Sequence, residues 1–225
     1  MSLKLFTHPL SQPCRAVLLY CRMNSIPIQE VFVDLGKGEH KGEDFTKKVN
    51  PLQKVPVLHH GDFILPESVA ILRYLSRSFP SADHWYPKES RAQARVDSYM
   101  AWQHLSTRNF GVMYFQTLSL IPKMTGKPVD EKRAKEAKVG LENCLNDITN
   151  YWLAKGRFIA GDEISIADLL AAAELEQPGM AGFDVKKYNG RIGEYMATVR
   201  EKLLPHYDEI HSMCHKIQQK ALAKA

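Results

Sequence analysis

The sequence predicts an α/β domain of mixed strand direction followed by an all-α domain. Short apolar runs of strand length alternate with helical segments over residues 1–80, whereas every long segment beyond Pro87 has helical spacing. Pro80 and Pro87 bracket the polar stretch at which the pattern changes. With 225 residues, 44% of them hydrophobic and 24% charged, the chain is larger than a usual single globular domain. We therefore expect two domains, over residues 1–80 and 88–220.

The first domain is predicted to have the element order βαβαββα. Short apolar runs predict its strands, at residues 3–7, 31–34, 55–58 and 63–65, and helical spacing predicts its helices, at residues 14–23, 45–49 and 68–78. The turn His60-Gly61-Asp62 makes the last two strands a hairpin, and His59 and His60 are expected to be exposed there. Parallel strands need a crossover and antiparallel strands do not, so this order predicts a mixed sheet.

The second domain is predicted to contain helices only. Its first helix is expected to be long, from about Ala92 to Leu120, before Pro122, Gly126 and Pro128 interrupt the pattern. Further helices are expected at about residues 130–154, 165–176, 188–203 and 205–220. Ser165 and Asp168 have the spacing of a capping box, so this motif is interpreted as structural rather than catalytic.

The charge pattern and the start of the chain limit the classes of partner. Lys and Arg number 30 against 25 Asp and Glu, a formal net charge of +5, and the excess is spread along the chain without a basic arm or stripe. No nucleic-acid partner is therefore expected. The apolar runs are short, so no membrane span is expected, and the first residues lack the features of a secretory signal. These features predict a cytoplasmic protein.

The cysteines and histidines do not favour metal chemistry. Cys14, Cys21, Cys144 and Cys214 are scattered without the spacing of a zinc site or a dithiol motif, and are expected to be buried thiols. His211 and His215 lie one helical turn apart and could form a metal pair, but an exposed face of a terminal helix is favoured. No metal site is predicted.

Ser11 stands where the first predicted strand leads into the first predicted helix. It is a candidate N-cap, because Ser is among the residues preferred there. Alternatively, its hydroxyl can donate to an anion that the positive end of the helix dipole also stabilises, and a bound thiolate would suit that position. A dithiol redox motif would have its nucleophilic Cys at position 11, so disulfide exchange by a cysteine pair is disfavoured.

Two further features lie at element boundaries of the first domain. Pro56 heads a predicted strand, as an ordinary edge-strand proline or as part of a cis Val55–Pro56 bond that would turn the Val55 backbone outward to a peptide-like ligand. Glu67 and Ser68 stand at the start of the third helix, where Ser68 is again a cap or an anion site. Together with Ser11 they suggest a groove for a small anionic peptide.

These segments resemble a known family, the cytosolic glutathione S-transferases, and most closely their theta class. In the first domain the resemblance rests on Ser11-Gln12-Pro13-Cys14-Arg15, Asn50-Pro51 to Val55-Pro56, and Glu67-Ser68-Val69-Ala70-Ile71. In the second it rests on Ala94-Arg95-Val96-Asp97, Ala101-Trp102-Gln103-His104, Gly161-Asp162 and Ser165-Ile166-Ala167-Asp168-Leu169. It covers most of the chain, weakly over about residues 110–155 and 178–225. It implies a thioredoxin-like first domain that binds glutathione, an all-helical second domain that contributes the electrophile site, and a homodimer.

The resemblance also implies a role for individual residues. Ser11 would stabilise the glutathione thiolate, and Val55 would bind the cysteinyl backbone. The remaining glutathione contacts would be Glu67 and Ser68 at the γ-glutamyl end, with His40 and Lys54 at the glycine carboxylate. Without the family, His40 and Lys54 would be solvated surface residues. Arg108 resembles a family residue that faces the electrophile, and on its own it would be a surface arginine.

The function that the resemblance implies is conjugation of reduced glutathione to small hydrophobic electrophiles, such as alkyl halides and epoxides, in detoxification. Glutathione peroxidase activity on organic hydroperoxides is a second activity it allows. Glutathione is then a co-substrate, and no cofactor is expected. Two alternatives remain open: a non-catalytic protein that binds glutathione or an apolar ligand, and a thiol reductase that works through Cys14 alone. The reductase ranks last because Cys14 is expected to lie buried inside its helix.

Overall fold

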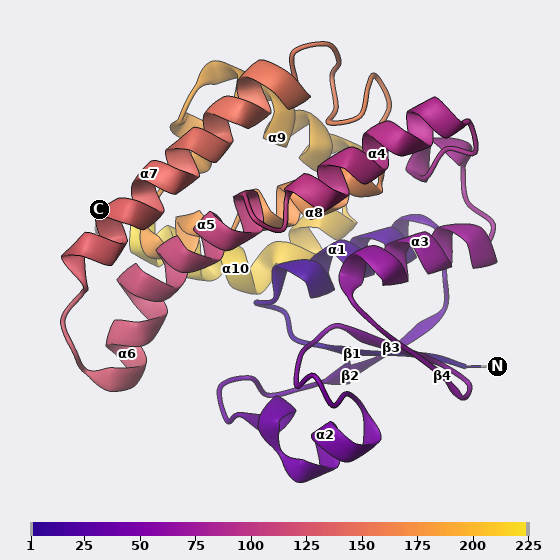
Figure 1. Ribbon diagram of the computed structural model, residues 1–225, viewed down its shortest axis with the longest axis horizontal. Coiled ribbons are helices and arrows are strands. Elements are labelled where there is room, and N and C mark those ends of the chain that lie inside the picture. Colours follow the sequence, from indigo (N-terminus) through magenta and orange to yellow (C-terminus); the bar gives the residue numbers. More distant parts are fainter. Residues whose placement is uncertain (1, 224–225) are drawn as a thin grey trace. The chain divides into compact units, whose positions relative to one another are not determined.

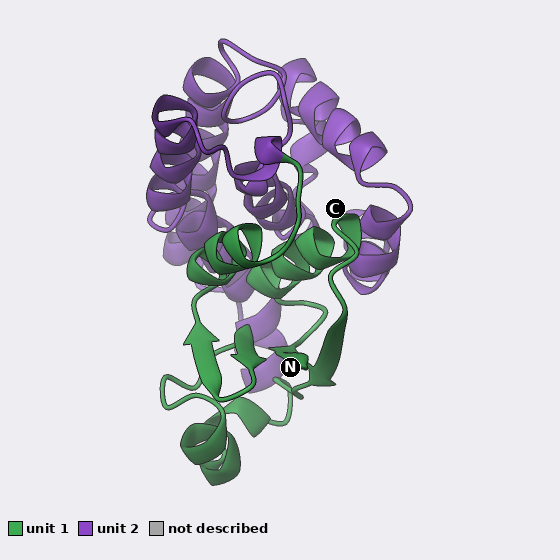
Figure 2. Ribbon diagram, turned by 90° about the vertical axis from the view of Figure 1, so that its right-hand side faces the viewer, with its two compact units in different colours: residues 1–82 green, residues 83–225 purple. Residues whose placement is uncertain are grey.

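The chain forms two compact units, residues 1–82 and 83–225 (Figure 2). The computed structural model describes residues 2–223 (Figure 1). Within this part of the chain, all four strands of the sheet belong to the first unit, and the second unit consists of helices and their connections. The predicted fold class, an α/β domain followed by an all-α domain, is confirmed.

The sheet of the first unit is mixed, as the element order predicts. Its strands are β1 (Leu3–Thr7), β2 (Ile28–Phe32), β3 (Val57–His60) and β4 (Phe63–Pro66), in the spatial order β2-β1-β3-β4. β1 is parallel to β2 and antiparallel to β3, and β3 is antiparallel to β4. The central strand β1 alternates buried Leu3, Leu5 and Thr7 with more exposed residues, so one face of this strand is buried more deeply than the other.

Helices cover both faces of this sheet. The helices α1 (Gln12–Met23) and α3 (Ser68–Ser78) lie side by side on one face, and α2 (Glu43–Lys48) lies on the other (Figure 1). Phe45 of α2 is buried in a cluster with Val33 and Val57. On the opposite side, α1 and α3 bury their apolar residues, among them Leu19 and Leu72. Burial of this kind stabilises a fold by about 1.5–3 kcal/mol for each large apolar side chain.

Two strands of the first unit begin elsewhere than predicted. β2 starts at Ile28 rather than Val31, because its parallel register with β1 pairs Ile28 with Leu3. β3 starts at Val57 rather than Val55, because Pro56 has no N–H to donate to the ladder. The prediction that His59 and His60 lie exposed in the hairpin turn is wrong. Both lie within β3 and are partly buried, and His60 Nδ1 is 2.7 Å from the hydroxyl of Tyr74.

The second unit contains seven α-helices within residues 83–223. They are α4 (Ser90–Trp102), α5 (Thr107–Phe115), α6 (Ile121–Thr125), α7 (Glu131–Asp147), α8 (Ile166–Leu175), α9 (Gly190–Lys202) and α10 (His206–Leu222). α8 is buried along its whole length and forms the centre of this unit. No helix between residues 2 and 223 is long and apolar enough to cross a membrane.

The long first helix predicted for this unit is interrupted. It breaks after Trp102, where the buried Gln103 carbonyl accepts from the N–H of Ser106 at 3.4 Å and of Arg108 at 3.0 Å. A π-helical turn, Gln116–Leu120, then links α5 to α6. Neither Gly nor Pro lies in residues 103–106, so the sequence contains no breaker there.

The predicted capping box at the start of α8 is confirmed. The Ser165 side chain accepts from the Ala167 N–H at 3.3 Å, and the Asp168 carboxylate accepts from the Ser165 N–H at 2.8 Å. Asp168 is fully buried and also accepts from the Ile159 N–H and from the Tyr195 hydroxyl. Burial raises the pKa of Asp168 to about 6, although these donors oppose the shift. The motif therefore ties the centre of the helical unit to α9 as well as capping α8.

Candidate active site

Four connections of the first unit leave its sheet at the same end. In the strand register, Phe6 of β1 lies opposite Val57 of β3, and Val57 lies opposite Pro66 of β4. Phe32, the last residue of β2, pairs with Thr7, the last residue of β1. The chain therefore leaves β1, β2 and β4, and enters β3, at one end of the sheet.

The residues of the first unit that were predicted to bind glutathione all lie on these four segments. They are Ser11 after β1, His40 after β2, Lys54 and Val55 before β3, and Glu67 and Ser68 after β4. Two helices, α1 and α3, start at the same end, so the positive ends of their dipoles point to the same region. Unpaired N–H groups at helix starts and positive dipole ends favour an anionic ligand.

Ser11 is the N-cap residue of α1, but its side chain does not cap the helix. Its backbone is extended, with φ −82° and ψ 116°, and its carbonyl accepts from the Arg15 N–H at 3.1 Å. Its hydroxyl makes no hydrogen bond to a backbone N–H of the first turn of α1, so backbone capping does not account for this serine, and it lies within hydrogen-bond reach of the Cys14 thiol. The side chain is partly exposed and stands beside the buried Cys14 thiol.

The segment 50–55 is held by the buried side chain of Asn50. Its amide donates to the Lys54 carbonyl at 2.9 Å, and its side-chain oxygen accepts from the Leu52 N–H at 3.0 Å. The Val55–Pro56 bond is cis, and within residues 2–223 the Val55 backbone has no hydrogen-bond partner. In the sequence, Asn50 before Pro51 is a signal of a turn, and its role in holding this segment depends on the hydrogen bonds of the folded chain.

Glu67 and Ser68 lie at the start of α3. Glu67 has φ 71°, an uncommon conformation for a residue with a side chain, and its carbonyl accepts from the Ile71 N–H at 2.9 Å. This conformation leaves the Glu67 side chain exposed, whereas Ser68 is 1% exposed. An uncommon backbone conformation of this kind is often found at ligand sites, because the surrounding structure has to enforce it.

His40 and Lys54 differ in their surroundings. His40 lies in a short 3₁₀ turn, Glu39–Lys41, and is partly buried, whereas Lys54 is exposed. Burial, and to a smaller extent the charge of Lys41, lowers the pKa of His40, which favours the uncharged imidazole. Its Nδ1 is buried and has no hydrogen-bond partner among the described residues.

Arg108 belongs to the second unit, where it is held by a buried carboxylate. It lies near the start of α5, and its Nε donates to Glu174 Oε1 of α8 at 2.8 Å. The Glu174 side chain is 1% exposed and that of Arg108 is 20% exposed, so this is a largely buried ion pair. The interpretation of Arg108 as an ordinary surface arginine is therefore wrong.

The four thiols and His211 are buried, and His215 is partly buried. All four cysteines are free and buried, and burial raises the pKa of the Cys14 thiol. The prediction that His211 and His215 lie on an exposed face is wrong, because His211 is fully buried and His215 is partly buried beside Glu176. Among residues 2–223 no three His, Cys, Asp or Glu side chains are grouped to hold a metal ion.

Comparison with known proteins matches both units to one family. Residues 1–77 match the family described as "Glutathione S-transferase, N-terminal domain", and residues 112–201 match "Glutathione S-transferase, C-terminal domain". The chain is 41% identical over 199 residues to glutathione S-transferase theta-1 of Bos taurus, covering 88% of this chain and 82% of that protein. It is also 41% identical over 203 residues to theta-1 of Homo sapiens, covering 90% of this chain and 82% of that protein.

Solved structures agree with the sequence comparison. The structure of human glutathione transferase theta-2 in complex with glutathione and an unknown ligand has a TM-score of 0.92 at 34% identity, and the match covers 100% of this chain and 92% of that chain. The apo form of human glutathione S-transferase T1-1 has a TM-score of 0.89 at 38% identity, with 97% and 91% covered. The fold, both family domains and these relatives show that this chain belongs to the theta class of the glutathione S-transferases and is a transferase enzyme.

Proposed function

We propose that the chain uses Ser11 to activate the thiol of glutathione for attack on small hydrophobic electrophiles. The observation that carries this proposal is the meeting of Ser11, Val55 and Glu67–Ser68 at one end of the sheet, together with the starts of α1 and α3. The Ser11 hydroxyl does not accept from a backbone N–H of α1, and a glutathione thiolate would compete for its proton only with the Cys14 thiol, whose pKa burial raises.

The free energy needed to lower the pKa of the glutathione thiol is within the range that one hydrogen bond and one helix dipole supply. A free thiol with a pKa of about 8.5 is about 3% ionised at pH 7, and a pKa about two units lower raises this to about 75%. The change corresponds to about 2.7 kcal/mol. A hydroxyl donor to a charged acceptor contributes about 1.5–3 kcal/mol and a helix N-terminus about 0.3–1 kcal/mol. Ser11 therefore does not need to lose its own proton.

The other proposed contacts position the tripeptide. The Val55 N–H and C=O pair with the cysteinyl backbone of glutathione, as in addition of a short strand. Glu67 receives the γ-glutamyl ammonium, and Ser68 at the start of α3 binds the carboxylate at the same end. Neutral His40 and cationic Lys54 bind the glycine carboxylate. In this proposal residues 1–80 bind glutathione, and residues 88–220 contribute the electrophile site, which includes Arg108.

The proposed substrates are alkyl halides and epoxides, with organic hydroperoxides as a second class. The thiolate displaces halide, or opens the epoxide, as the new C–S bond forms. With a hydroperoxide it attacks the O–O bond and takes one oxygen; the alcohol leaves after protonation, and a second glutathione converts the sulfenic acid to disulfide and water. A relative, human theta-class glutathione transferase, has been solved with the glutathione conjugate of 1-menaphthyl sulfate, which supports attack on electrophilic carbon.

We also propose a cytoplasmic homodimer with a role in detoxification.

The test is a comparison of Ser11→Ala with Ser78→Ala, an exposed serine at the end of α3. We expect Ser11→Ala to lower kcat/KM about tenfold to a hundredfold, because it removes one hydrogen bond to a charged acceptor. Ultraviolet titration of bound glutathione should show the thiol pKa returning toward its solution value in Ser11→Ala only. Full turnover in a folded Ser11→Ala enzyme, over a panel of halides, epoxides and hydroperoxides, would show that another group activates the thiol.

A further inference from the structure

The turn between β1 and α1 carries Ser11 and is closed by the residue at its start, His8. The Ser11 N–H donates to the His8 carbonyl at 2.9 Å, and the Leu10 N–H donates to Nδ1 of the His8 ring at 3.2 Å. His8 therefore accepts from two backbone donors of the turn, one with its main chain and one with its side chain. These bonds end at Ser11 and at the residue before it, so they help to fix the backbone that carries the hydroxyl.

Neighbouring side chains hold the His8 ring and the rest of the turn. The ring lies against Phe32, the last residue of β2, with the ring centroids 5.5 Å apart. The buried Arg15 of α1 donates from Nη1 to the Pro9 carbonyl at 3.1 Å, and from its backbone N–H to the Ser11 carbonyl at 3.1 Å. Within residues 8–11, His8 is the only titratable side chain. A change in its charge is therefore the one change of charge that this turn can undergo by itself.

The hydrogen bond from Leu10 specifies the protonation state of His8. A backbone N–H can only donate, so Nδ1 is the ring nitrogen without a proton, and the proton of the neutral ring lies on Nε2. In an imidazolium ion both ring nitrogens carry a proton, so Nδ1 could no longer accept. Protonation of His8 would therefore break one of the two bonds that close the turn at Ser11.

The surroundings of His8 favour the neutral ring. Burial lowers the pKa of His8 below its ordinary value of 6.5, and the charges of Arg15 and His40 lower it further. The carboxylate of Asp34, which follows β2, acts in the opposite direction and is outweighed. Because the pKa is lowered, the ring accepts from Leu10 at neutral pH, and it loses this ability as pH falls through the lowered value.

We propose that His8 is a positioning residue for Ser11, and that only its neutral form holds the Ser11 hydroxyl in the direction that serves the glutathione thiolate. The inference rests on the proposed function of Ser11 and extends it to a second residue. His8 acts only through the turn and does not touch glutathione. A donor that is already oriented loses less entropy when the thiolate binds, so a loosened turn weakens the hydrogen bond from Ser11.

The first experiment is a double-mutant cycle of His8 and Ser11 in the full chain, with an alkyl halide that the unaltered chain turns over. His8→Leu has no acceptor in its side chain and should lower kcat/KM at neutral pH about twofold to tenfold, the effect of losing one neutral hydrogen bond. In a Ser11→Ala background, His8→Leu should have no further effect, because the residue through which it acts is altered. His8→Asn should retain most of the rate, because an Asn side-chain oxygen accepts from the N–H two residues on.

The pH profile separates this role from a merely structural one. At saturating glutathione, kcat of the unaltered chain should fall more than kcat of His8→Asn as pH is lowered from about 7 to about 5, because only the unaltered chain has a His8 to protonate. The additional fall should approach the loss that His8→Leu shows at neutral pH. The control is His206→Asn, which alters a histidine of the second unit and should keep the profile of the unaltered chain.

The outcomes distinguish this inference from the proposed function. Full turnover in Ser11→Ala would overturn both. If Ser11→Ala loses turnover but His8→Leu costs the same factor with and without Ser11, the proposed function stands and the role of His8 is wrong. Superimposable pH profiles of the unaltered chain and His8→Asn would also overturn the inference, and this comparison decides the matter if circular dichroism shows that His8→Leu does not fold.

Discussion

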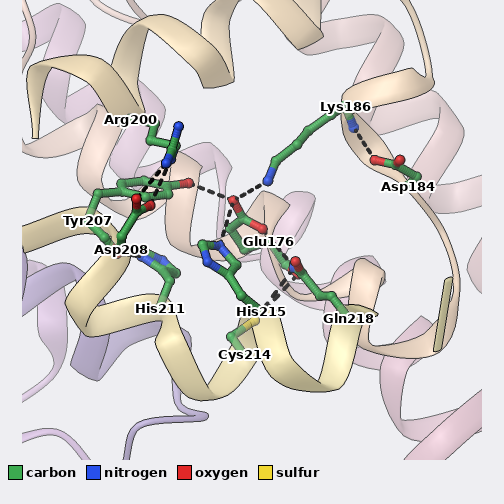
Figure 3. A network of polar contacts seen from close by, with 10 residues as sticks. All are labelled: Glu176, Asp184, Lys186, Arg200, Tyr207, Asp208, His211, Cys214, His215 and Gln218. Carbon is green, nitrogen blue, oxygen red and sulfur yellow. Dashed lines mark hydrogen bonds and ion pairs between the residues drawn. The ribbon is translucent and has the colours of Figure 1, made fainter. Parts of the chain in front are cut away.

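Glu176 shows how one buried charge is kept in the folded chain. A carboxylate without partners in the interior would be strongly unfavourable, but here a tyrosine, a lysine and a glutamine donate to it (Figure 3). Burial alone would raise the pKa of Glu176. The hydrogen bond from His215 and the charges of Lys186 and His211 outweigh burial and hold that pKa well below its usual value of 4.5.

The lowered pKa of Glu176 makes the free energy of unfolding of the chain sensitive to acid. A carboxyl group with a lower pKa in the folded than in the unfolded chain contributes stability above the unfolded pKa, and this contribution is lost as pH falls. We therefore expect the free energy of unfolding to fall from about pH 5 to about pH 3 less steeply in Glu176→Gln than in the unaltered chain. At neutral pH, Glu176→Gln should cost about 1–3 kcal/mol, because it removes the charged acceptor of the buried Tyr207 and Gln218 donors, whereas the half-exposed Lys186 can be hydrated.

Urea denaturation over this pH range measures both effects. Glu209→Gln is the control, because Glu209 lies on α10 with a side chain that is 61% exposed. An identical acid slope in the unaltered chain and in Glu176→Gln would contradict the assignment of the acid sensitivity to Glu176.

At the scale of elements, α5 and α7 pack closely at Gly140, where a larger residue would meet the Phe110 ring. A Cβ built on Gly140 of α7 would lie 2.1 Å from the Phe110 ring of α5. The two helices therefore approach closely over this residue, and the Phe110 ring fills the space that a side chain would take. Gly within a helix normally lowers its stability, so close packing explains the presence of Gly140 in α7.

Gly140→Ala should destabilise the helical unit in spite of the higher helix propensity of alanine. We expect a loss of about 1–3 kcal/mol from overpacking, measured as the free energy of unfolding in urea. Gly190→Ala at the start of α9 is the control, because a Cβ there meets no atom within 4 Å. Stabilisation by Gly140→Ala would mean that the Phe110 ring moves aside at little cost.

At the scale of the whole molecule, ligand binding and stability are linked. A ligand that binds only the folded chain raises its stability by about 2.7 kcal/mol at a concentration of 100 times Kd. Glutathione should therefore raise the Tm of the chain in calorimetry. The rise should be smaller in Ser68→Ala at the same concentration, because Ser68 is proposed to bind the γ-glutamyl carboxylate.

The comparison uses the increase in Tm of each protein over its own unliganded value, because Ser68 is buried and its loss also affects folding. Ser78→Ala serves again as the exposed control on α3. An equal increase in Ser68→Ala would remove Ser68 from the proposed glutathione site.

The sequence by itself determined the fold class and most elements of this protein. Local signals carry this information: the alternation in β1, the hairpin between β3 and β4, and the capping box at Ser165 each depend on residues close together in the chain. The helix from residue 68 to 78 was predicted with its observed bounds for the same reason. The family resemblance, carried by short motifs such as residues 11–15, was confirmed by the comparisons.

Only the tertiary structure decided the surroundings of the buried charges. Glu176 draws its partners from positions 186, 207, 215 and 218, and Arg108 draws its partner from position 174. Contacts of this kind come from different helices and have no fixed spacing in the sequence. The break after Trp102 is similar, because no Gly or Pro marks it. Patterns along the chain specify which face of an element is apolar, whereas packing between elements decides which polar side chains meet behind that face.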